Sequence, residues 1–516
     1  MKRILIPLAC LFVAVASVPA LAQEGSTNTR SKPDGLVRST AWSVYFNNYL
    51  YRFSNGDLRA TDNTSIQTVE NTDDEFFIGY LELGAIFEAN LAHGINFYVD
   101  LYRVGFWGND SPEYVAANPV YFRTLNFSLG LFEGASLVVG RQRYSVNPDR
   151  AHHNYVLTDN IDAVLFSLDQ KSWGVDIFAD LFSMNSPVDA VYELHADRHS
   201  GTVKYFDGDV NIVRFAVVPF VKLFDDTDTT LTLKPYAMFA RVGATGKKDG
   251  SQGGNENTSA GATGNHADND WLALTGISAY ARVSALSFLF EAGLSFGKDR
   301  KGPGVPDVDF SGYMLHASAV LKTGDLASFG AAVIYASGAE TDADGNYKNY
   351  GYVSFKADKI GGYLFRDYYG VYPYGILSTS GIQIDPSESS KRSPMAGFML
   401  RGSIDNLDLA TFSKGKNGLD IDVEYWMYFD TSTSGANFSS TTLAADKFDQ
   451  KRFGEFLGWE LDLRIAWSID SDVLTIGVET GFFVPGEFFA WPVANARAPF
   501  GNDTFWGVTV FSALKF

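Results

Sequence analysis

The sequence has almost no cysteine and only one long apolar run, and each shortage excludes a class of protein. Among its 516 residues there is a single cysteine, Cys10. One thiol cannot form a disulfide within the chain or a cysteine-ligated metal cluster. Beyond residue 22, no continuous apolar stretch reaches roughly 18 residues, the length that a membrane-spanning helix needs. The sequence therefore predicts no transmembrane helix.

Basic residues are also in short supply. Lysine and arginine number 41 against 60 aspartates and glutamates, which gives a formal net charge of −19. A strongly acidic chain repels nucleic acids and other polyanions, so no nucleic-acid partner is expected. No linker separates two hydrophobic cores, and the chain is therefore assigned to one structural unit.

What the sequence does have begins with an export signal. Residues 1–3 carry two positive charges, residues 4–18 are mostly apolar, and Ala-Leu-Ala at 20–22 is typical of a cleavage site. This pattern predicts a secretory signal peptide over residues 1–22. Cys10 lies inside it, so the exported chain is expected to contain no thiol.

The C-terminal residues indicate the solvent in which the chain folds. Residues 459–467 alternate strictly, with Trp, Leu, Leu, Ile and Trp on one face and Glu, Asp, Arg and Ala on the other. Successive side chains of a strand point to opposite faces, so one face is apolar and the other is polar. A soluble sandwich would cover the apolar face with a second sheet. A barrel in lipid leaves that face outside and keeps the charged face in a wet lumen.

Alternating segments recur along the whole chain, and the gaps between them alternate short and long. Eighteen segments are found, at residues 44–53, 76–91, 95–107, 121–132, 136–146, 160–168, 173–184, 211–224, 230–242, 271–283, 287–297, 310–322, 329–337, 395–410, 419–430, 455–467, 474–484 and 504–516. Short turns at one end and long loops at the other are what a transmembrane barrel with both termini in the periplasm requires.

We therefore predict an all-β fold, a transmembrane antiparallel up-and-down β-barrel of about 18 strands. It covers residues 43–516, follows a flexible periplasmic lead at 23–42, and lies in the outer membrane of a Gram-negative bacterium. The long external loops are expected at residues 185–210, 243–270, 338–394 and 431–454. The loop at 338–394 is rich in tyrosine, so it either packs on itself, folds inward to narrow the pore, or stacks on sugars.

Charged residues in the strands are assigned to the lumen, because a charge on the outer face costs roughly 2–4 kcal/mol at the middle of the bilayer. The acidic residues expected to line the pore are Glu82, Asp100, Asp162, Asp180, Asp420, Asp422, Glu424, Glu460, Asp462 and Glu479. The basic residues expected to line it are Arg141, Arg143, Arg214, Lys234, Arg282, Arg401 and Arg464. Acids outnumber bases in this set.

Three further arginines, Arg103, Arg123 and Arg241, share the alternation phase of lipid-facing neighbours. All three are expected at the external ends of strands. Guanidinium groups bind phosphate well, so we expect these residues to face lipopolysaccharide in the outer leaflet.

No set of residues points to catalysis, a resident metal or a cofactor. His195 and His199 are one helical turn apart but lack a third ligand. Residues 342–346 resemble the start of a calcium loop, yet position twelve of that loop is Val353 in place of glutamate. No nucleophile elbow or phosphate-binding glycine loop stands out. The chain is expected not to be an enzyme.

Two groups of motifs resemble the alginate-export family of outer-membrane proteins. The first is Val-Gly-Arg-Gln-Arg at 139–143 followed by Asp-Asn-Ile-Asp-Ala-Val at 159–164. The second is Leu-Gly-Trp-Glu-Leu-Asp-Leu at 457–463 with Gly-Phe-Phe-Val-Pro-Gly at 481–486. The resemblance implies a monomeric, passive conduit through which a polyuronate leaves the cell. A polyanion calls for a lumen rich in arginine and lysine, and the excess of acids departs from that pattern.

Three functions stay open at the level of sequence. The first is a channel of the alginate-export type, which passes polar or charged solutes or an acidic polysaccharide. The second is a general or cation-preferring porin. The third is a plugged structural or adhesive barrel that acts through its external loops. The expected partners are outer-membrane lipid, lipopolysaccharide and the solute in transit.

Overall fold

The computed structural model describes most of the strand residues and several loop segments. The described residues are 37–54, 75–107, 120–147, 151–183, 211–226, 228–242, 271–299, 307–324, 326–338, 340–341, 347–349, 351–354, 361–364, 375–378, 381–383, 395–408, 417–431, 456–469, 473–486 and 504–516. Some predictions lie outside these residues: the signal peptide at 1–22, the loops at 185–210 and 243–270, most of the loop at 431–454, His195 with His199, and residues 342–346.

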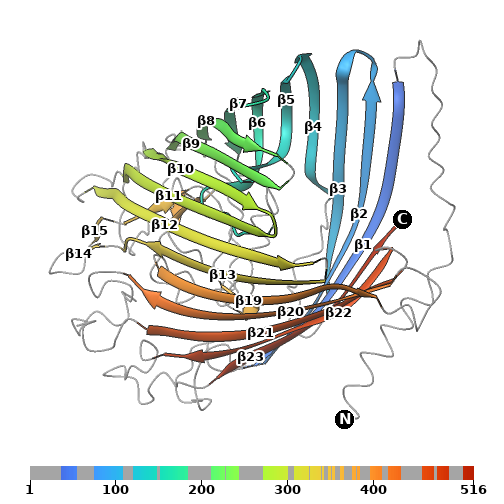
Figure 1. Cartoon of the computed structure of the whole chain (residues 1–516), viewed down its shortest axis with the longest axis vertical. Coiled ribbons are helices and arrows are strands. Elements are labelled where there is room, and N and C mark those ends of the chain that lie inside the picture. The colour runs from blue at the N-terminus through green and yellow to red at the C-terminus, as the bar shows by residue number, and fades with distance from the viewer. Residues whose placement is uncertain are drawn as a thin grey trace, which may run out of the picture.

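The wall of the molecule is one antiparallel sheet in which each strand pairs with its neighbours along the chain (Figure 1). Within the described residues this sheet has 20 strands, and two short additions, β14 and β15, leave 18 for the wall. The wall strands are β1 (Val37–Ser54), β2 (Glu75–Leu91), β3 (Ile95–Trp107), β4 (Val120–Phe132), β5 (Ala135–Ser145), β6 (Thr158–Asp169), β7 (Trp173–Ser183), β8 (Asn211–Asp225), β9 (Thr229–Val242), β10 (Trp271–Val283), β11 (Leu286–Asp299), β12 (Val308–Thr323), β13 (Ala327–Ala336), β19 (Met395–Asp408), β20 (Gly418–Asp430), β21 (Phe456–Ile469), β22 (Leu474–Pro485) and β23 (Phe505–Lys515).

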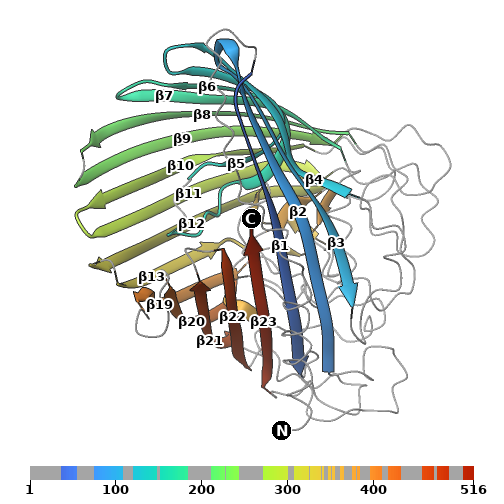
Figure 2. The same cartoon turned by 90° about the vertical axis from the view of Figure 1, so that its right-hand side faces the viewer.

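The first and last strands close the sheet into a barrel. β1 pairs antiparallel with β23 in a continuous register from Tyr45↔Lys515 to Ser54↔Trp506. One residue further on, the backbone N–H of Val44 donates to the carbonyl of Phe516 at 3.1 Å, and the N–H of Phe516 donates to the carbonyl of Val44 at 2.8 Å. Figure 2 shows β23 beside β1 at this seam. The predicted fold class, a closed antiparallel barrel of 18 strands, is confirmed.

Two details differ from the expectation. β1 begins at Val37, so residues 37–42, which we expected in a loose lead, pair with β2 as part of the wall. The region 338–394 also contains short strands that the sequence pattern did not reveal. They are β14 (Glu340–Thr341), β15 (Tyr347–Asn349), β16 (Val353–Ser354), β17 (Gly375–Ser378) and β18 (Gly381–Gln383).

The two rims of the barrel differ in the length of their connections. One rim, called the turn end here, carries the short connections η2 (Ala92–Gly94) and residues 133–134, 170–172 and 284–285. The beginning of β1 lies there too, because Val37 pairs with Leu91 beside η2. The opposite rim, called the loop end, carries the long connections. This arrangement is the alternation of short and long gaps seen in the sequence.

Alternate residues of each strand meet different surroundings. On β11, Phe290 and Leu294 are 43% and 55% exposed, whereas Leu289, Glu291 and Ser295 are at most 3% exposed. Exposed large apolar side chains recur in this way on strand after strand, so the outer surface is an apolar belt and the polar side chains lie inside. Within the described residues, no helix is long and apolar enough to cross a membrane.

Candidate functional site in the barrel interior

Most of the charged residues assigned to the lumen lie on the inner face of the wall. Strand pairing and the exposure of their neighbours place them there, because paired residues share a face of the sheet. Those on the inner face are Glu82, Asp100, Asp180, Asp420, Asp422, Glu424, Glu460, Asp462, Glu479, Arg214, Lys234, Arg282, Arg401 and Arg464. Whether they line a conducting pore remains a prediction.

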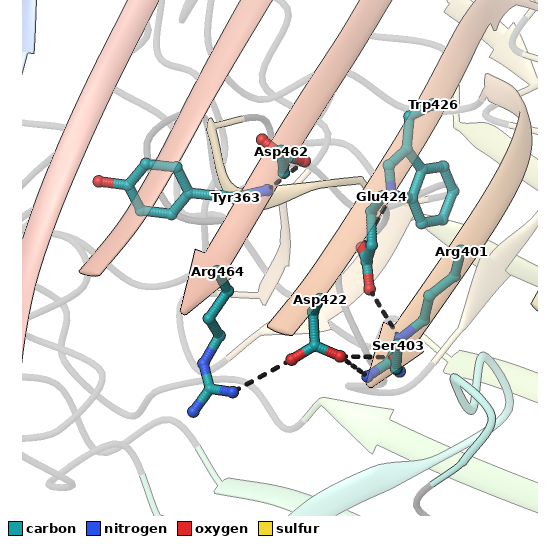
Figure 3. Close-up of polar contacts among 8 residues, drawn as sticks. All are labelled: Tyr363, Arg401, Ser403, Asp422, Glu424, Trp426, Asp462 and Arg464. Carbon is teal, nitrogen blue, oxygen red and sulfur yellow. Dashed lines mark hydrogen bonds and ion pairs between the residues drawn. The ribbon is translucent and has the colours of Figure 1, made fainter. Parts of the chain in front are cut away.

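A ladder of alternating charges runs across β19, β20 and β21 (Figure 3). Asp422 accepts hydrogen bonds from the Arg401 guanidinium at 2.8 Å and from the Arg464 guanidinium at 3.2 Å. The Ser403 hydroxyl donates to the same carboxylate at 2.6 Å. The Arg401 Nε atom is also 3.6 Å from Glu424. The two arginine side chains are 35% and 38% exposed, so they present charge to the interior even though each has an acidic partner.

Residues 151–157, here called the first inward segment, join β5 to β6 and reach across the interior. The Nδ1 atom of His152 is 2.7 Å from the Ser318 hydroxyl, and its Nε2 atom is 3.0 Å from the Ser287 hydroxyl. These serines belong to β12 and β11, and β7 to β10 separate those strands from β6 in the wall. The backbone N–H of Tyr155 donates to Glu291 on β11 at 3.0 Å. The segment therefore spans from one side of the wall to another.

A second buried contact supports the first inward segment. The Nδ1 atom of His316 on β12 is 2.9 Å from the Glu291 carboxylate that accepts from Tyr155. The Tyr155 ring meets the His316 ring edge to face, with centroids 4.7 Å apart. Neither histidine stood out in the sequence. An isolated histidine at an inner position of a strand, such as His316, is the signal that could have marked this contact.

Residues 351–354 and 361–364, here called the second inward segment, belong to the tyrosine-rich region between β13 and β19. Tyr352 is fully buried, and a Cβ atom on Gly312 of β12 would overlap its backbone. The N–H of Val353 donates to the Ser295 hydroxyl at 3.1 Å. These contacts resolve the alternatives left open for this region, because its described residues fold inward.

Backbone donors of residues 361–364 meet two buried carboxylates of β21. The N–H of Tyr363 donates to Asp462 at 3.0 Å (Figure 3), and the N–H of Leu364 donates to Glu460. The Tyr428 hydroxyl accepts from the N–H of Gly362 at 2.9 Å and donates to Glu460 at 2.7 Å. These two acids of the expected lumen therefore hold a protein segment.

The two inward segments also contact each other. The hydroxyl of Ser354 donates to the backbone carbonyl of Val156 at 3.0 Å. In addition, the ring of His153 lies 6.0 Å from that of Trp426 on β20, next to the charge ladder. The segments and the ladder therefore meet in one part of the interior, and this part is the candidate functional site.

The placement of Arg123 corrects one expectation. Its guanidinium is 2.7 Å from Glu82 and 3.6 Å from Asp100, and it lies over the ring of Tyr102 at 4.7 Å. It is therefore on the inner face and does not face lipopolysaccharide. The cause is a β-bulge: Asp100 pairs with Thr124 and Leu101 with Phe122, which leaves Arg123 as an extra residue whose neighbours no longer follow strict alternation.

Arg141, Arg143 and Asp162 correct the assignment in the other direction. Val139 and Val164 pair with each other and are 42% and 47% exposed, so they are on the outer face. Two residues further along both strands, Arg141 pairs with Asp162, and Arg143 follows in the same row. These three residues therefore lie outside the lumen. The cost of an outward charge is small near a rim, and all three lie towards the loop end.

The remaining residues lie as follows. Arg103 and Arg241 are exposed on the outer face near the loop end, where Arg103 pairs with the exposed Leu83. Arg214 and Asp180 form a buried ion pair, and Lys234 donates to the carbonyl of Val146 at 2.8 Å. Within the described part of the chain, no group of three or more His, Cys, Asp or Glu side chains could hold a metal ion.

Comparison with known proteins gives likenesses of structure only. No protein-family model matches the sequence, and no curated relative matches it, so the motif-level resemblance to the alginate-export family finds no support there. Among solved structures, the chain is similar to three Pseudomonas aeruginosa proteins. For OccK2 (OpdF) in complex with glucuronate, identity is 10%, coverage is 93% of this chain and 99% of that one, and the TM-score is 0.48.

The other two likenesses are of the same kind. For OpdK with vanillate the identity is 10%, the coverage 93% and 100%, and the TM-score 0.47. For the outer membrane protein OprD the identity is 11%, the coverage 94% and 95%, and the TM-score 0.45. The description of the barrel given above comes from its own strand pairing.

Proposed function

We propose that this protein is an outer-membrane channel through which small polar or charged solutes diffuse passively. The observation that carries the proposal is a closed barrel with an apolar outer belt and a charged inner face. Closure satisfies every backbone group of the wall within lipid, which an open sheet cannot do. In the proposed orientation the turn end faces the periplasm and the loop end faces outward. The channel works as a monomer without a cofactor, and it is not an enzyme.

The narrowest part of the proposed channel lies where the two inward segments meet the charge ladder. Segments held by Ser287, Ser318, Asp462 and Glu460 occupy interior space that would otherwise be open. A narrow passage beside Arg401, Asp422 and Arg464 favours small solutes with polar or charged groups over large or apolar ones. The segments therefore supply size selection, and the ladder supplies charge selection.

A general or cation-preferring porin fits the inner charges better than a polyuronate exporter does. With Arg141 and Arg143 outside, the expected basic track loses two members. Arg123, Arg214, Arg401 and Arg464 each have an acidic partner on the inner face. Long-range attraction of a polyanion requires net positive charge along its path, and paired arginines beside further acids do not provide it. Alginate export stays the second candidate, supported by the motifs at 139–143 and 457–463.

Single-channel recording in a planar bilayer under a salt gradient tests the proposal. We expect discrete conductance steps and a reversal potential that indicates cation preference. Arg401→Gln should raise that preference by roughly two- to fivefold in permeability ratio, since one charge at close range in a wet pore changes the energy by about 1 kcal/mol or less. Arg241→Gln removes the same charge from the outer face and should leave the reversal potential unchanged.

Three results would argue against this reading. Anion preference together with block by uronate oligomers would favour alginate export. A silent membrane despite confirmed insertion would favour a plugged barrel that acts through its external loops. Equal shifts in Arg401→Gln and Arg241→Gln would mean that the ladder does not face the ion path.

A further inference from the structure

The outer surface of β3, β4 and β5 carries arginines at a height where other strands carry aromatic residues. On β9, β10 and β11 the outer row near the loop end contains Phe239, Trp271 and Phe296, whose rings contact one another. On β3 and β5 the corresponding positions are Arg103, Arg141 and Arg143. We call these three residues the arginine patch. One sector of the belt thus replaces its aromatic border with positive charge.

Strand register brings the arginine patch together. β4 lies between β3 and β5, and on β4 Arg103 is level with Val120 while Arg141 is level with Leu125. Arg143 is two residues nearer the loop end than Arg141, so its level falls between these two. Neighbouring strands are about 4.8 Å apart, which places Arg103 and Arg143 on columns roughly 10 Å apart. Two guanidinium groups at that spacing can serve one ligand that carries two phosphates.

Apolar side chains continue from the arginine patch towards the turn end. Phe122, Leu125, Phe127 and Val139 are all exposed on the outer face. β4 runs from the loop end to the turn end, so Phe127 lies deeper in the belt than the arginines. A surface with cations near the rim and apolar groups below matches a lipid whose headgroup is anionic and whose chains are hydrocarbon.

One acid tempers the arginine patch. Asp162 lies 3.9 Å from the Nε atom of Arg141, so it offsets part of the positive charge of that residue. Arg143 pairs across the strand with Asn160, which is neutral. The patch as a whole keeps a net positive charge, and Arg103 and Arg143 are its exposed members.

We propose that the arginine patch binds the phosphate groups of lipopolysaccharide in the outer leaflet. Arg103 and Arg143 hold the phosphates through charge-assisted hydrogen bonds, and the acyl chains lie over Phe127 and Val139. Asp162 limits the affinity by occupying Arg141. This inference rests on the proposed outer-membrane location but not on solute passage, so a binding measurement is independent of conductance. Arg241 on β9 offers a separate contact at the same rim.

Binding of purified deep-rough lipopolysaccharide to delipidated protein in mild detergent tests the inference. We expect Arg103→Gln/Arg143→Gln to bind at least roughly tenfold more weakly than the unaltered protein, or about 1.4 kcal/mol. Asp162→Asn should bind more tightly, because it frees Arg141. A merely structural role of these residues does not predict opposite signs. The charge-matched control, Arg38→Gln/Lys515→Gln, removes two cations at the turn end and should bind as the unaltered protein does.

The ligand can be distinguished in the same assay. Dephosphorylated lipid should bind as weakly to the unaltered protein as phosphorylated lipid binds to the double variant. Millimolar inorganic phosphate should compete poorly, because it lacks the acyl chains. Equal binding of both lipids, equal losses in the control variant, or full competition by inorganic phosphate would each overturn the proposal. Circular dichroism and heat-modifiable gel mobility check that every variant is a folded barrel.

Discussion

The two inward segments occupy the same part of the interior but are held by different chemistry. The first inward segment uses its own side chain, His152, to reach two wall hydroxyls, with one backbone donor on Glu291. The second inward segment uses backbone N–H groups at 362–364 to reach acceptors that all belong to the wall. A change within the first segment can therefore release it, whereas the second must be released mainly from the wall. Sequence variation in the second segment is tolerated as long as Glu460 and Asp462 are kept.

The largest expected effect comes from removing a wall acceptor of the second segment. Glu460→Ala leaves the N–H of Leu364 and the hydroxyl of Tyr428 without this acceptor, and each buried unsatisfied donor costs about 1–3 kcal/mol. We expect amide hydrogen exchange at residues 361–364 to rise by roughly tenfold to a hundredfold or more. Single-channel conductance should increase as the segment moves away.

Glu424→Ala is the matched control for this change. It removes another inner acid of the same size, but one whose partners are Arg401 and Trp426 on the wall. Exchange at 361–364 should stay at the level of the unaltered protein. A comparable rise in both variants would mean that the wall acids act through overall barrel stability and do not hold the segment.

A smaller effect is expected at the first segment. His152→Ala removes both contacts to Ser318 and Ser287, and net contributions of about 1 kcal/mol for each hydrogen bond predict roughly tenfold faster exchange of the Tyr155 and Val156 amides. Exchange at residues 361–364 should change much less. Release of both segments by this one change would contradict the difference in how they are held.

The smallest expected effect concerns the link between the segments. Ser354→Ala removes the hydrogen bond to the Val156 carbonyl, which contributes about 1 kcal/mol. A double-mutant cycle of His152→Ala and Glu460→Ala, measured by amide exchange, gives the coupling between the segments. We expect the coupling energy to fall towards zero when Ser354→Ala is added. Unchanged coupling would show that the segments communicate through the wall and not through this contact.

The strands were largely readable from the sequence because their signal is local. Alternation gave all eighteen wall strands, and the pattern of short and long gaps gave the two rims. The faces were readable wherever a strand is regular, as for Glu460, Asp462 and Arg464 on β21. Arg123 failed because a bulge is decided by the pairing of β4 with β3, and no residue type in β4 marks it.

The interior contacts were beyond the reach of the sequence for a different reason. The inward segments join residues far apart in the chain, such as His152 with Ser318 and Tyr363 with Asp462. Their hydrogen bonds depend on how the barrel closes and on which strands face each other across it. Arg141 and Asp162 failed because their charge was weighed as if they lay at the middle of the bilayer, whereas they lie near a rim.

The bulge in β4 also gives this strand an unusual tolerance to a change in length. A regular strand has a reading phase, and losing one residue turns every later side chain to the opposite face. Deleting a residue from β8, for example, would turn Phe215 or its successors inward. β4 already carries one residue more than its pairing with β3 requires, so deleting Arg123 restores the phase and removes only its contacts with Glu82, Asp100 and Tyr102. In this barrel, β4 is where a one-residue deletion does the least harm.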